Sequence, residues 1–397
     1  MKKEHKLKPM HNLLKKFKGD RTIWLVVIFL YIISILAVYS STGTLAYRFR
    51  AGNTEYYVVK HFIIIVFGFG LMYLAHNVRY SYYSRFSQLA LIVAIPLLIF
   101  TLFKGTAIHE AQRWVTVPFI NLSFQSSDIA KLALIIYLAR GLTRKQAVIS
   151  DLHASFLPLA IPVILVCALI LPANFSTAAI LFITSMILMF IGRIPFKYIM
   201  GITGITIVGV AFFVAVLLAM PDSGRAHTWQ NRIHSFVNKE AGDTYQADQA
   251  KIAIASGGIV GKLPGNSSQR IFLPQAYSDF IYAIIIEEYG LAGGFLVLLF
   301  YLILLYRGIR IAHKSPGTFG ALLAVGLSFS LVFQALINMA VAVNLLPVTG
   351  QPLPLISMGG TSLWFTSLSI GIILSVSRKV EQIENEELNH AEAITTG

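Results

Sequence analysis

The residues best placed to do chemistry surround one carboxylate, Asp279, where a polar stretch meets an apolar one. The polar stretch, from Tyr245 to Gly290, is rich in glycine and carries Lys262 and Arg270 shortly before Asp279. A partly desolvated carboxylate can act as a general base toward a hydroxyl group, and cations can bind phosphate. The pattern indicates a site for a diphosphate-bearing substrate at a membrane boundary. A helix cap is the structural alternative, because acidic residues are favoured in the first turn of a helix.

A second charged group, Asp128 and Lys131, stands at the beginning of an apolar stretch. A spacing of three residues places both side chains on one face of a helix, so a mutual salt bridge is one interpretation. The other interpretation is a functional site, because charged side chains at membrane depth are costly and are usually functional. Arg113, next to Trp114 in the preceding loop, has a guanidinium group that can bind phosphate. Both roles stay open for this group.

Three further polar features lie within or between apolar stretches. Glu287 and Glu288 are adjacent, so at least one of them should point inward to a partner or a cavity. Gln334 and Asn338, four residues apart, should share a helix face and join helices by hydrogen bonds. The stretch 346–360 is rich in proline and glycine and predicts a rigid loop. Such backbone at membrane depth must be buried in protein or line a cavity.

The composition decides which elements must position these residues. The chain has 397 residues, of which 56% are hydrophobic and only 13% are charged, whereas soluble domains have about 25% charged residues. It is therefore expected to be an integral membrane protein. The formal net charge of +14 does not indicate nucleic acid, because the cations gather at the N-terminus and in short loops, as in cytoplasmic segments. The single cysteine, Cys167, excludes an intramolecular disulfide.

Apolar stretches near the ~20 residues that a bilayer requires occur about ten times, at residues 22–41, 57–76, 84–103, 127–141, 152–171, 177–192, 196–219, 280–306, 318–344 and 358–377. We expect an all-α integral membrane protein with about ten transmembrane helices. A basic tail (1–21) precedes spans one to seven (22–219). A large outer loop (220–279) leads to spans eight to ten (280–378) and an acidic tail (379–397). Each inner loop is then basic, which places both termini in the cytoplasm.

Four groups of motifs resemble the SEDS family (shape, elongation, division and sporulation), which includes the FtsW, RodA and SpoVE branches. The resemblance covers about residues 110–378. The motifs are Gln112–Trp114 with Gln125–Lys131, Tyr245-Gln246 with Ser256–Gly258 and Gly261-Lys262, Leu273-Pro274 with Ser278–Ile281 and Glu287–Gly290, and Leu346–Gly350 with Leu353-Pro354 and Ser357–Gly360. Two positions depart from the family pattern. Asp128 stands where the family usually has Glu, after a lost proline, and Asn174 stands where it usually has Asp.

The resemblance implies an inverting peptidoglycan glycosyltransferase of the bacterial plasma membrane that uses lipid II, an undecaprenyl-diphosphate disaccharide pentapeptide, as donor and acceptor. Asp279 matches the family's essential acid, and Asp128 and Lys131 match its acid–lysine pair. The basic N-terminus and short cytoplasmic ends are more similar to the division branch, FtsW, than to the elongation branch, RodA. That branch implies action at the division septum. The implied partners are an FtsI-like class B penicillin-binding transpeptidase and other divisome membrane proteins, with no nucleic acid.

We therefore expect Asp279 to be catalytic, and the substrate-binding residues to be Arg113, Asp128, Lys131, Lys262 and Arg270. The sequence requires no cofactor, and one aspartate offers too few ligands to predict a metal site. A divalent cation, Mg²⁺ or Mn²⁺, stays open as a helper at the diphosphate. Other interpretations are a transporter or flippase for lipid-linked precursors, an elongation-type polymerase, and a division scaffold without chemistry.

Overall fold

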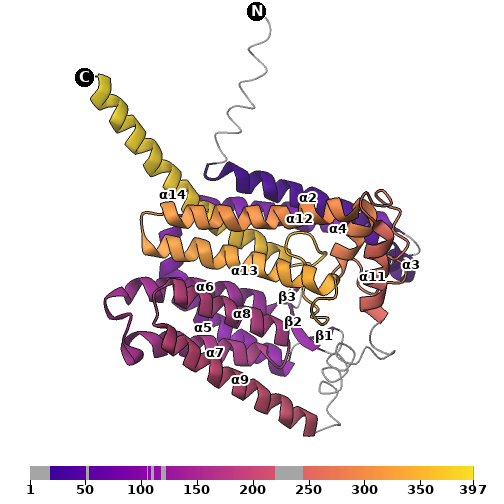
Figure 1. Cartoon of the computed structure of the whole chain (residues 1–397), viewed down its shortest axis with the longest axis horizontal. Helices are drawn as coiled ribbons and strands as arrows, with labels where there is room; N and C mark the ends of the chain where they lie inside the picture. The colour runs from indigo at the N-terminus through magenta and orange to yellow at the C-terminus, as the bar shows by residue number, and fades with distance from the viewer. Residues whose placement is uncertain are drawn as a thin grey trace, which may run out of the picture.

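The chain forms a bundle of helices with a small sheet at one end (Figure 1). The computed structural model describes residues 18–50, 53–104, 106–108, 111–117, 122–219 and 245–396. Most of the expected N-terminal tail lies outside the described residues, and so does the first part of the expected large loop, 220–244. The predicted fold class, an all-α protein with many membrane spans, is confirmed.

A helix coincides with each of the ten apolar stretches. These helices are α2 (Arg21–Ser41), α4 (Thr54–Asn77), α5 (Tyr80–Lys104), α6 (Ser126–Arg144), α7 (Leu157–Ile170), α8 (Phe175–Ile191), α9 (Phe196–Ala219), α12 (Ile281–Lys314), α13 (Thr318–Ala342) and α14 (Ser362–Thr396). Within the described ranges, 8 helices are long and apolar enough to cross a membrane. Of the other two, α8 is shorter, with 17 residues. Helix α6 has only 19 residues and carries Asp128, Lys131, Arg140 and Arg144.

The outer surface of the bundle is apolar, as a protein solvated by lipid requires. Ile205 and Phe212 of α9 are 74% and 71% exposed. In water such exposure would oppose folding, whereas lipid tails accept it. Some buried hydroxyl groups inside the bundle bond the preceding helical turn, for example Thr184 to the carbonyl oxygen of Ile180 and Ser185 to that of Leu181. The apolar outer surface fits a membrane-embedded fold.

A small antiparallel sheet between α5 and α6 was not predicted. Its strands β1 (Thr106–Ile108), β2 (Ala111–Val117) and β3 (Leu122–Gln125) pair in that order. Only a loop was predicted for this segment. The β-branched run from Val115 to Val117 favours an extended strand. The sheet lies at the same end of the bundle as the short helices α3 (Gly43–Arg50) and α11 (Tyr245–Gly257) (Figure 1).

The opposite end of the bundle gathers the start of α2 and the end of α12 beside α14. Arg307 of α12 forms a salt bridge with Asp20, the N-cap of α2, and Lys314 bonds Glu384 of α14. Helix α14 projects beyond the bundle here (Figure 1). The helix does not end at the expected boundary of residue 378, because the segment expected to be the acidic tail continues it to Thr396. Its glutamate- and alanine-rich sequence has high helix propensity, which explains the continuation.

Candidate active site

Asp279 lies directly before α12, at the end of the bundle that carries the sheet. Its side chain is half-buried, and its carboxylate accepts a hydrogen bond from the hydroxyl of Ser278 at 3.0 Å. The N-cap of α12 is Phe280, one residue later. The helix-cap interpretation therefore does not describe the position of Asp279. The structure places a partly desolvated carboxylate at the junction between the loop and the membrane helix, where a general base was predicted.

Three successive carbonyl groups hold the backbone that carries this carboxylate. The carbonyl oxygen of Tyr277 accepts from the amide of Met358 at 3.0 Å, and that of Ser278 accepts from the Ser357 hydroxyl at 2.6 Å. The carbonyl oxygen of Asp279 itself accepts from the Asn338 side chain at 2.8 Å. Each such hydrogen bond contributes about 0.5–1.5 kcal/mol net. The backbone of residues 277–279 is thus fixed from two sides.

The loop between α13 and α14 supplies one of those sides. It packs Leu353, Leu355 and Ile356 into the protein with at most 2% exposure. Within the predicted loop, Gln351 and residues 353–357 are therefore buried in the protein, as non-helical backbone at membrane depth requires. Ser357 was not predicted to position the site. Its hydroxyl donates to Ser278 and accepts from the amide of Leu353 at 2.7 Å, and only its place in the Ser-Met-Gly-Gly motif could have marked it.

Two amides on α13 link Asp279 to the charged pair of α6. Asn338 donates to the carbonyl oxygens of Asp279 and Gln351, at 2.8 and 2.7 Å. Gln334, one turn earlier, accepts from the ammonium of Lys131 at 3.2 Å and donates to the Pro352 carbonyl at 3.1 Å. One helical turn corresponds to about 5.4 Å along the axis. The predicted joining role of these two amides is confirmed, and it brings the two candidate regions onto one face of α13.

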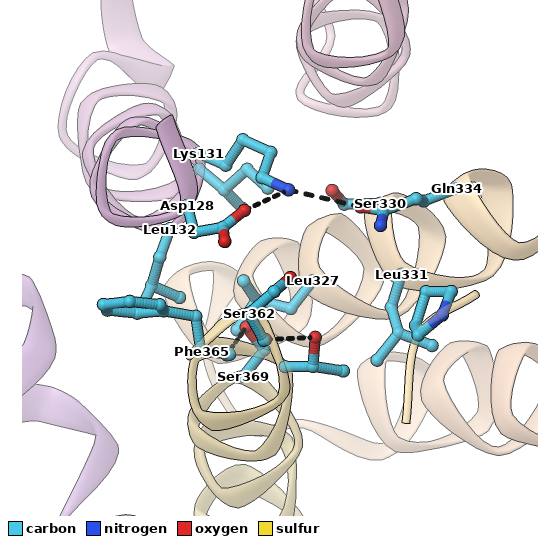
Figure 2. Close-up of a pocket in the computed structure, with 13 residues that line it drawn as sticks. Asp128, Lys131, Leu132, Leu327, Ser330, Leu331, Gln334, Ser362, Phe365 and Ser369 are labelled. Atoms are coloured by element: carbon cyan, nitrogen blue, oxygen red, sulfur yellow. Dashed lines mark hydrogen bonds and ion pairs between the residues drawn. The ribbon is translucent and has the colours of Figure 1, made fainter. Parts of the chain in front are cut away.

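Asp128 and Lys131 form a salt bridge at the edge of a small cavity (Figure 2). Their charged atoms are 2.8 Å apart, and the Asp128 side chain is only 4% exposed. The Asp128 Oδ2 atom has no hydrogen-bond partner within the described part of the chain. The cavity measures about 40 Å³ and is lined on α13 and α14 by the hydroxyl groups of Ser330, Ser362, Thr366 and Ser369. A polar cavity of this size has room for water molecules, which need about 10–15 Å³ each.

Lys262 and Arg270 contact other groups than Asp279. The ammonium of Lys262 lies 2.7 Å from Glu287, whose side chain is fully buried. The same carboxylate accepts from the hydroxyl of Ser268 at 2.9 Å. The guanidinium of Arg270 donates to the Ser40 carbonyl at 3.4 Å. The inward orientation predicted for the glutamate pair is confirmed. The phosphate-binding role of the two cations stays a prediction, and in this structure Lys262 is paired with Glu287.

The loop after α11 is inserted into a break in α12 at Gly290, where φ is 70° and ψ is −177°. The helix hydrogen bonds that the break removes are replaced by bonds to the loop. They are Leu291 N to Gly258 O, Ala292 N to Ile259 O, Lys262 N to Glu287 O and Leu263 N to Glu288 O, at 2.9 to 3.3 Å. Unpaired backbone groups are costly in a membrane. This exchange therefore locks the glycine-rich loop onto the helix that follows Asp279.

Replacing Gly290 by alanine is expected to destabilise the protein by about 2–5 kcal/mol. The backbone of Gly290 occupies a region open only to glycine, and an added Cβ would lie 2.0 Å from the Ile259 carbonyl oxygen. Thermal unfolding of the purified protein in detergent measures the effect. Gly204→Ala on α9 is the matched control, because nothing lies within 4 Å of a Cβ there. Equal melting temperatures for the two variants would contradict the role of the break.

The two departures from the family pattern keep their local contacts. Asn174 is the N-cap of α8 and accepts from the amide of Thr177 at 3.2 Å. An aspartate would cap the helix in the same way. Gln351 donates to the Thr177 hydroxyl at 2.8 Å, which ties this segment to the loop above the site. Asp128 keeps the acid–lysine pair although its side chain is one methylene shorter than that of Glu.

Burial and the negative charge of Asp279 raise the pKa of Tyr277, so this phenol stays neutral beside the carboxylate. Arg113 belongs to β2, and its side chain lies outside the described residues. Among the residues that the structure describes, no three His, Cys, Asp or Glu side chains come together to hold a metal ion.

Comparisons with known proteins agree with this geometry. The profile of the FtsW/RodA/SpoVE family, described as cell cycle protein, matches residues 20–382. Stage V sporulation protein E of Bacillus subtilis (strain 168) is 31% identical over 374 residues, which cover 92% of this chain and 98% of that protein. The probable peptidoglycan glycosyltransferase FtsW of Trichlorobacter lovleyi is 32% identical over 366 residues, which cover 90% of this chain and 93% of the relative.

Solved structures share the fold. One solved structure concerns the structural coordination of polymerization and crosslinking by a peptidoglycan synthase complex. A chain of that structure matches with a TM-score of 0.71 and 22% identity, over 92% of this chain and 99% of that chain. The rod shape determining protein RodA of Thermus thermophilus matches with a TM-score of 0.65 and 22% identity, over 91% of this chain and 97% of that chain. At this identity the likeness concerns the fold alone.

Fold and relatives together define a multi-pass membrane protein of the peptidoglycan glycosyltransferase class, as predicted. The chain belongs to the SEDS family. Relatives of about 30% identity come from both the sporulation and the FtsW branches. The branch of this chain is therefore part of the proposal that follows.

Proposed function

We propose that this chain polymerises lipid II into glycan strands and does so at the division septum. The observation that carries the reaction is the half-buried Asp279 carboxylate at the head of α12, held by three backbone carbonyl bonds and linked through α13 to the Asp128–Lys131 pair. A fixed backbone with a carboxylate at the loop–membrane junction suits a general base, because such catalysis depends on positioning.

The reaction balances with one base. The 4-hydroxyl of the acceptor sugar attacks the anomeric carbon of the donor, a new C–O bond forms, and the bond to the polyprenyl diphosphate breaks with inversion. The hydroxyl proton passes to Asp279. The diphosphate leaves as an anion and needs no proton, whereas the leaving group of a glycosidase does. A general base of this kind contributes about 10²–10⁴-fold to the rate.

The leaving diphosphate needs positive charge nearby. Lys131 suits this role best among the described cations, because Gln334 and Asn338 place its ion pair and Asp279 on the same face of α13. The predicted roles of Arg113, Lys262 and Arg270 at the phosphates belong to the same proposal. A divalent cation at the diphosphate belongs to the proposal as well. Adding EDTA to the polymerisation assay tests whether the reaction requires such a cation.

The experiment is polymerisation by the purified protein together with its proposed transpeptidase partner, an FtsI-like class B penicillin-binding protein. Fluorescently labelled lipid II should be converted into glycan chains that separate on a gel. A flippase would instead move labelled lipid across liposomes without forming any bond, and a scaffold would do neither. Intact lipid II after prolonged incubation with both proteins would overturn the proposed reaction.

The septal role rests on the similarity to FtsW proteins and on the basic N-terminus. Depletion of the protein in its host distinguishes the branches. Filamentous cells are expected for a division enzyme, rounded cells for an elongation enzyme, and normal growth with defective spores for a sporulation enzyme. Either of the latter two results would move the chain to the corresponding branch without affecting the proposed chemistry.

A further inference from the structure

A second cavity lies at the other end of the bundle, away from Asp279. It measures about 280 Å³ and is enclosed by the start of α2, the last turns of α12 and the middle of α14. Four cations line it, Arg21, Arg307, Arg310 and Lys314, together with the hydroxyl-bearing residues Thr22 and Ser377. Three carboxylates, Asp20, Glu381 and Glu384, also line it. The cavity is much larger than a water molecule requires.

The pairing of these charges leaves two guanidinium groups available. Arg307 is bound to Asp20 through contacts of 2.5 and 2.6 Å, and Lys314 is bound to Glu384 at 2.5 Å. Glu381 accepts the backbone amide of Gly19 at 2.5 Å. Arg21 and Arg310 make no hydrogen bond or ion pair with any residue that the structure describes. Two guanidinium groups from different helices thus line one cavity.

Each of these arginines stands at the polar end of an exposed apolar stripe. Residues four and eight positions along a helix share a face. Leu25 and Phe29 follow Arg21 in this way and are 57% and 49% exposed. Tyr306 and Leu302 precede Arg310 in the same way and are 62% and 43% exposed. The stripes lie on neighbouring helices, since Phe29 stacks on Phe300 with ring centroids 5.7 Å apart.

We propose that this cavity binds the phosphate group of an anionic phospholipid, with the acyl chains along the seam between α2 and α12. Guanidinium groups bind phosphate oxygens by paired hydrogen bonds, and basic pockets between membrane helices take anionic headgroups. Free phosphate would share the headgroup chemistry. The apolar stripes favour the lipid, because inorganic phosphate has nothing to place on them.

The test is native mass spectrometry of the purified full-length protein with added phosphatidylglycerol, and the key variant is Arg21→Gln/Arg310→Gln. The wild type should retain bound phosphatidylglycerol in preference to phosphatidylcholine. At about 1 kcal/mol for each basic side chain near an anionic membrane surface, the double variant should bind phosphatidylglycerol about 30-fold more weakly. Each single variant should lose about five-fold, and these carry the test if the double variant fails to fold.

The matched control is Arg79→Gln/Arg144→Gln. It removes the same charge from exposed positions that lie outside the residues lining the cavity. This control should keep wild-type lipid retention. Equal losses in both double variants would show only a general attraction of the basic surface and would overturn the site. Competition by millimolar inorganic phosphate equal to that by the lipid would assign the cavity to free phosphate and reject the lipid.

Discussion

Asp279→Asn is expected to abolish polymerisation of lipid II while leaving the fold intact. The amide keeps the size of the side chain and can still accept from Ser278, whereas the backbone bonds of residues 277–279 do not involve the side chain of Asp279. The negative charge and the capacity to take a proton are lost, which should lower turnover by about 10²–10⁴-fold. Gel analysis of labelled glycan chains under saturating lipid II measures the loss.

Two controls make this result specific. Asp248→Asn on α11 removes a half-exposed carboxylate that is paired with Lys251 in the same segment of the chain, and this variant should polymerise at the wild-type rate. Asp279→Ala should be as inactive as Asp279→Asn and should elute as the same monodisperse species. Wild-type activity in either variant of residue 279 would exclude this side chain as the base and leave the family fold without an assigned acid.

The helices, and the position of Asp279 directly before one of them, could be predicted from the sequence for a physical reason. A bilayer imposes a length and an apolar composition on each span, so single stretches can be recognised without knowing their neighbours. Asp279 was visible because it stands where such a stretch begins. The amides Gln334 and Asn338 were predicted from their spacing on one face, and the structure shows them joining α13 to the segments around it.

The glycine-rich loop was beyond the sequence analysis because its partners are far along the chain. The pairing of Lys262 with Glu287 could not be predicted, since nothing local shows that residues 258–263 bond to the backbone around the break in α12. The glycines of this loop and of α12 were the sequence feature that could have indicated the contact. Gly261 and Gly290 both have a positive φ. At each of them, an added Cβ would lie closer than 2.5 Å to backbone atoms of the other segment. Each marks a place where only glycine lets two backbones meet.

The small sheet and the helical tail were missed for a different reason. Neither is required by the membrane, so apolar periodicity gives no sign of them. Strand pairing of β2 with β3 depends on a short connection that brings the β-branched run beside Leu122–Gln125. Helix α14 continues because its tail has helix-forming residues and because Glu384 contacts Lys314 of α12. Local propensity and a distant contact together extend a helix that membrane length alone would end.

The break in α12 and the two amides of α13 have a common consequence for catalysis. The loop insertion fixes the helix after Asp279, and the loop before α14 fixes the backbone that precedes it. The segment that carries the proposed catalytic carboxylate is therefore held through its backbone. Precise placement of this kind is what a proton transfer at a sugar hydroxyl requires. The same reasoning applies to the buried ion pair of α6, whose Lys131 is held by Gln334, one turn from Asn338 along α13.

The ion pair of α6 gives the second large effect. Lys131→Met leaves the Asp128 carboxylate buried without its cation, and breaking a buried pair in this way costs about 3–5 kcal/mol. A marked drop in melting temperature is expected. Activity should also fall, but the loss of fold would hide its cause. The informative variant is Asp128→Asn/Lys131→Gln, because two neutral amides can hydrogen-bond to each other and require no buried charge.

This double variant separates structure from chemistry. If Lys131 stabilises the leaving diphosphate, the double variant should recover most of the lost stability yet polymerise about 10²–10³-fold more slowly than the wild type, as when one electrostatic donor is removed from an active site. Asp128→Glu, which keeps the charges, should remain active. A double variant that folds and polymerises normally would show that the pair only joins α6 to α13, and the positive charge at the diphosphate would have to come from another residue.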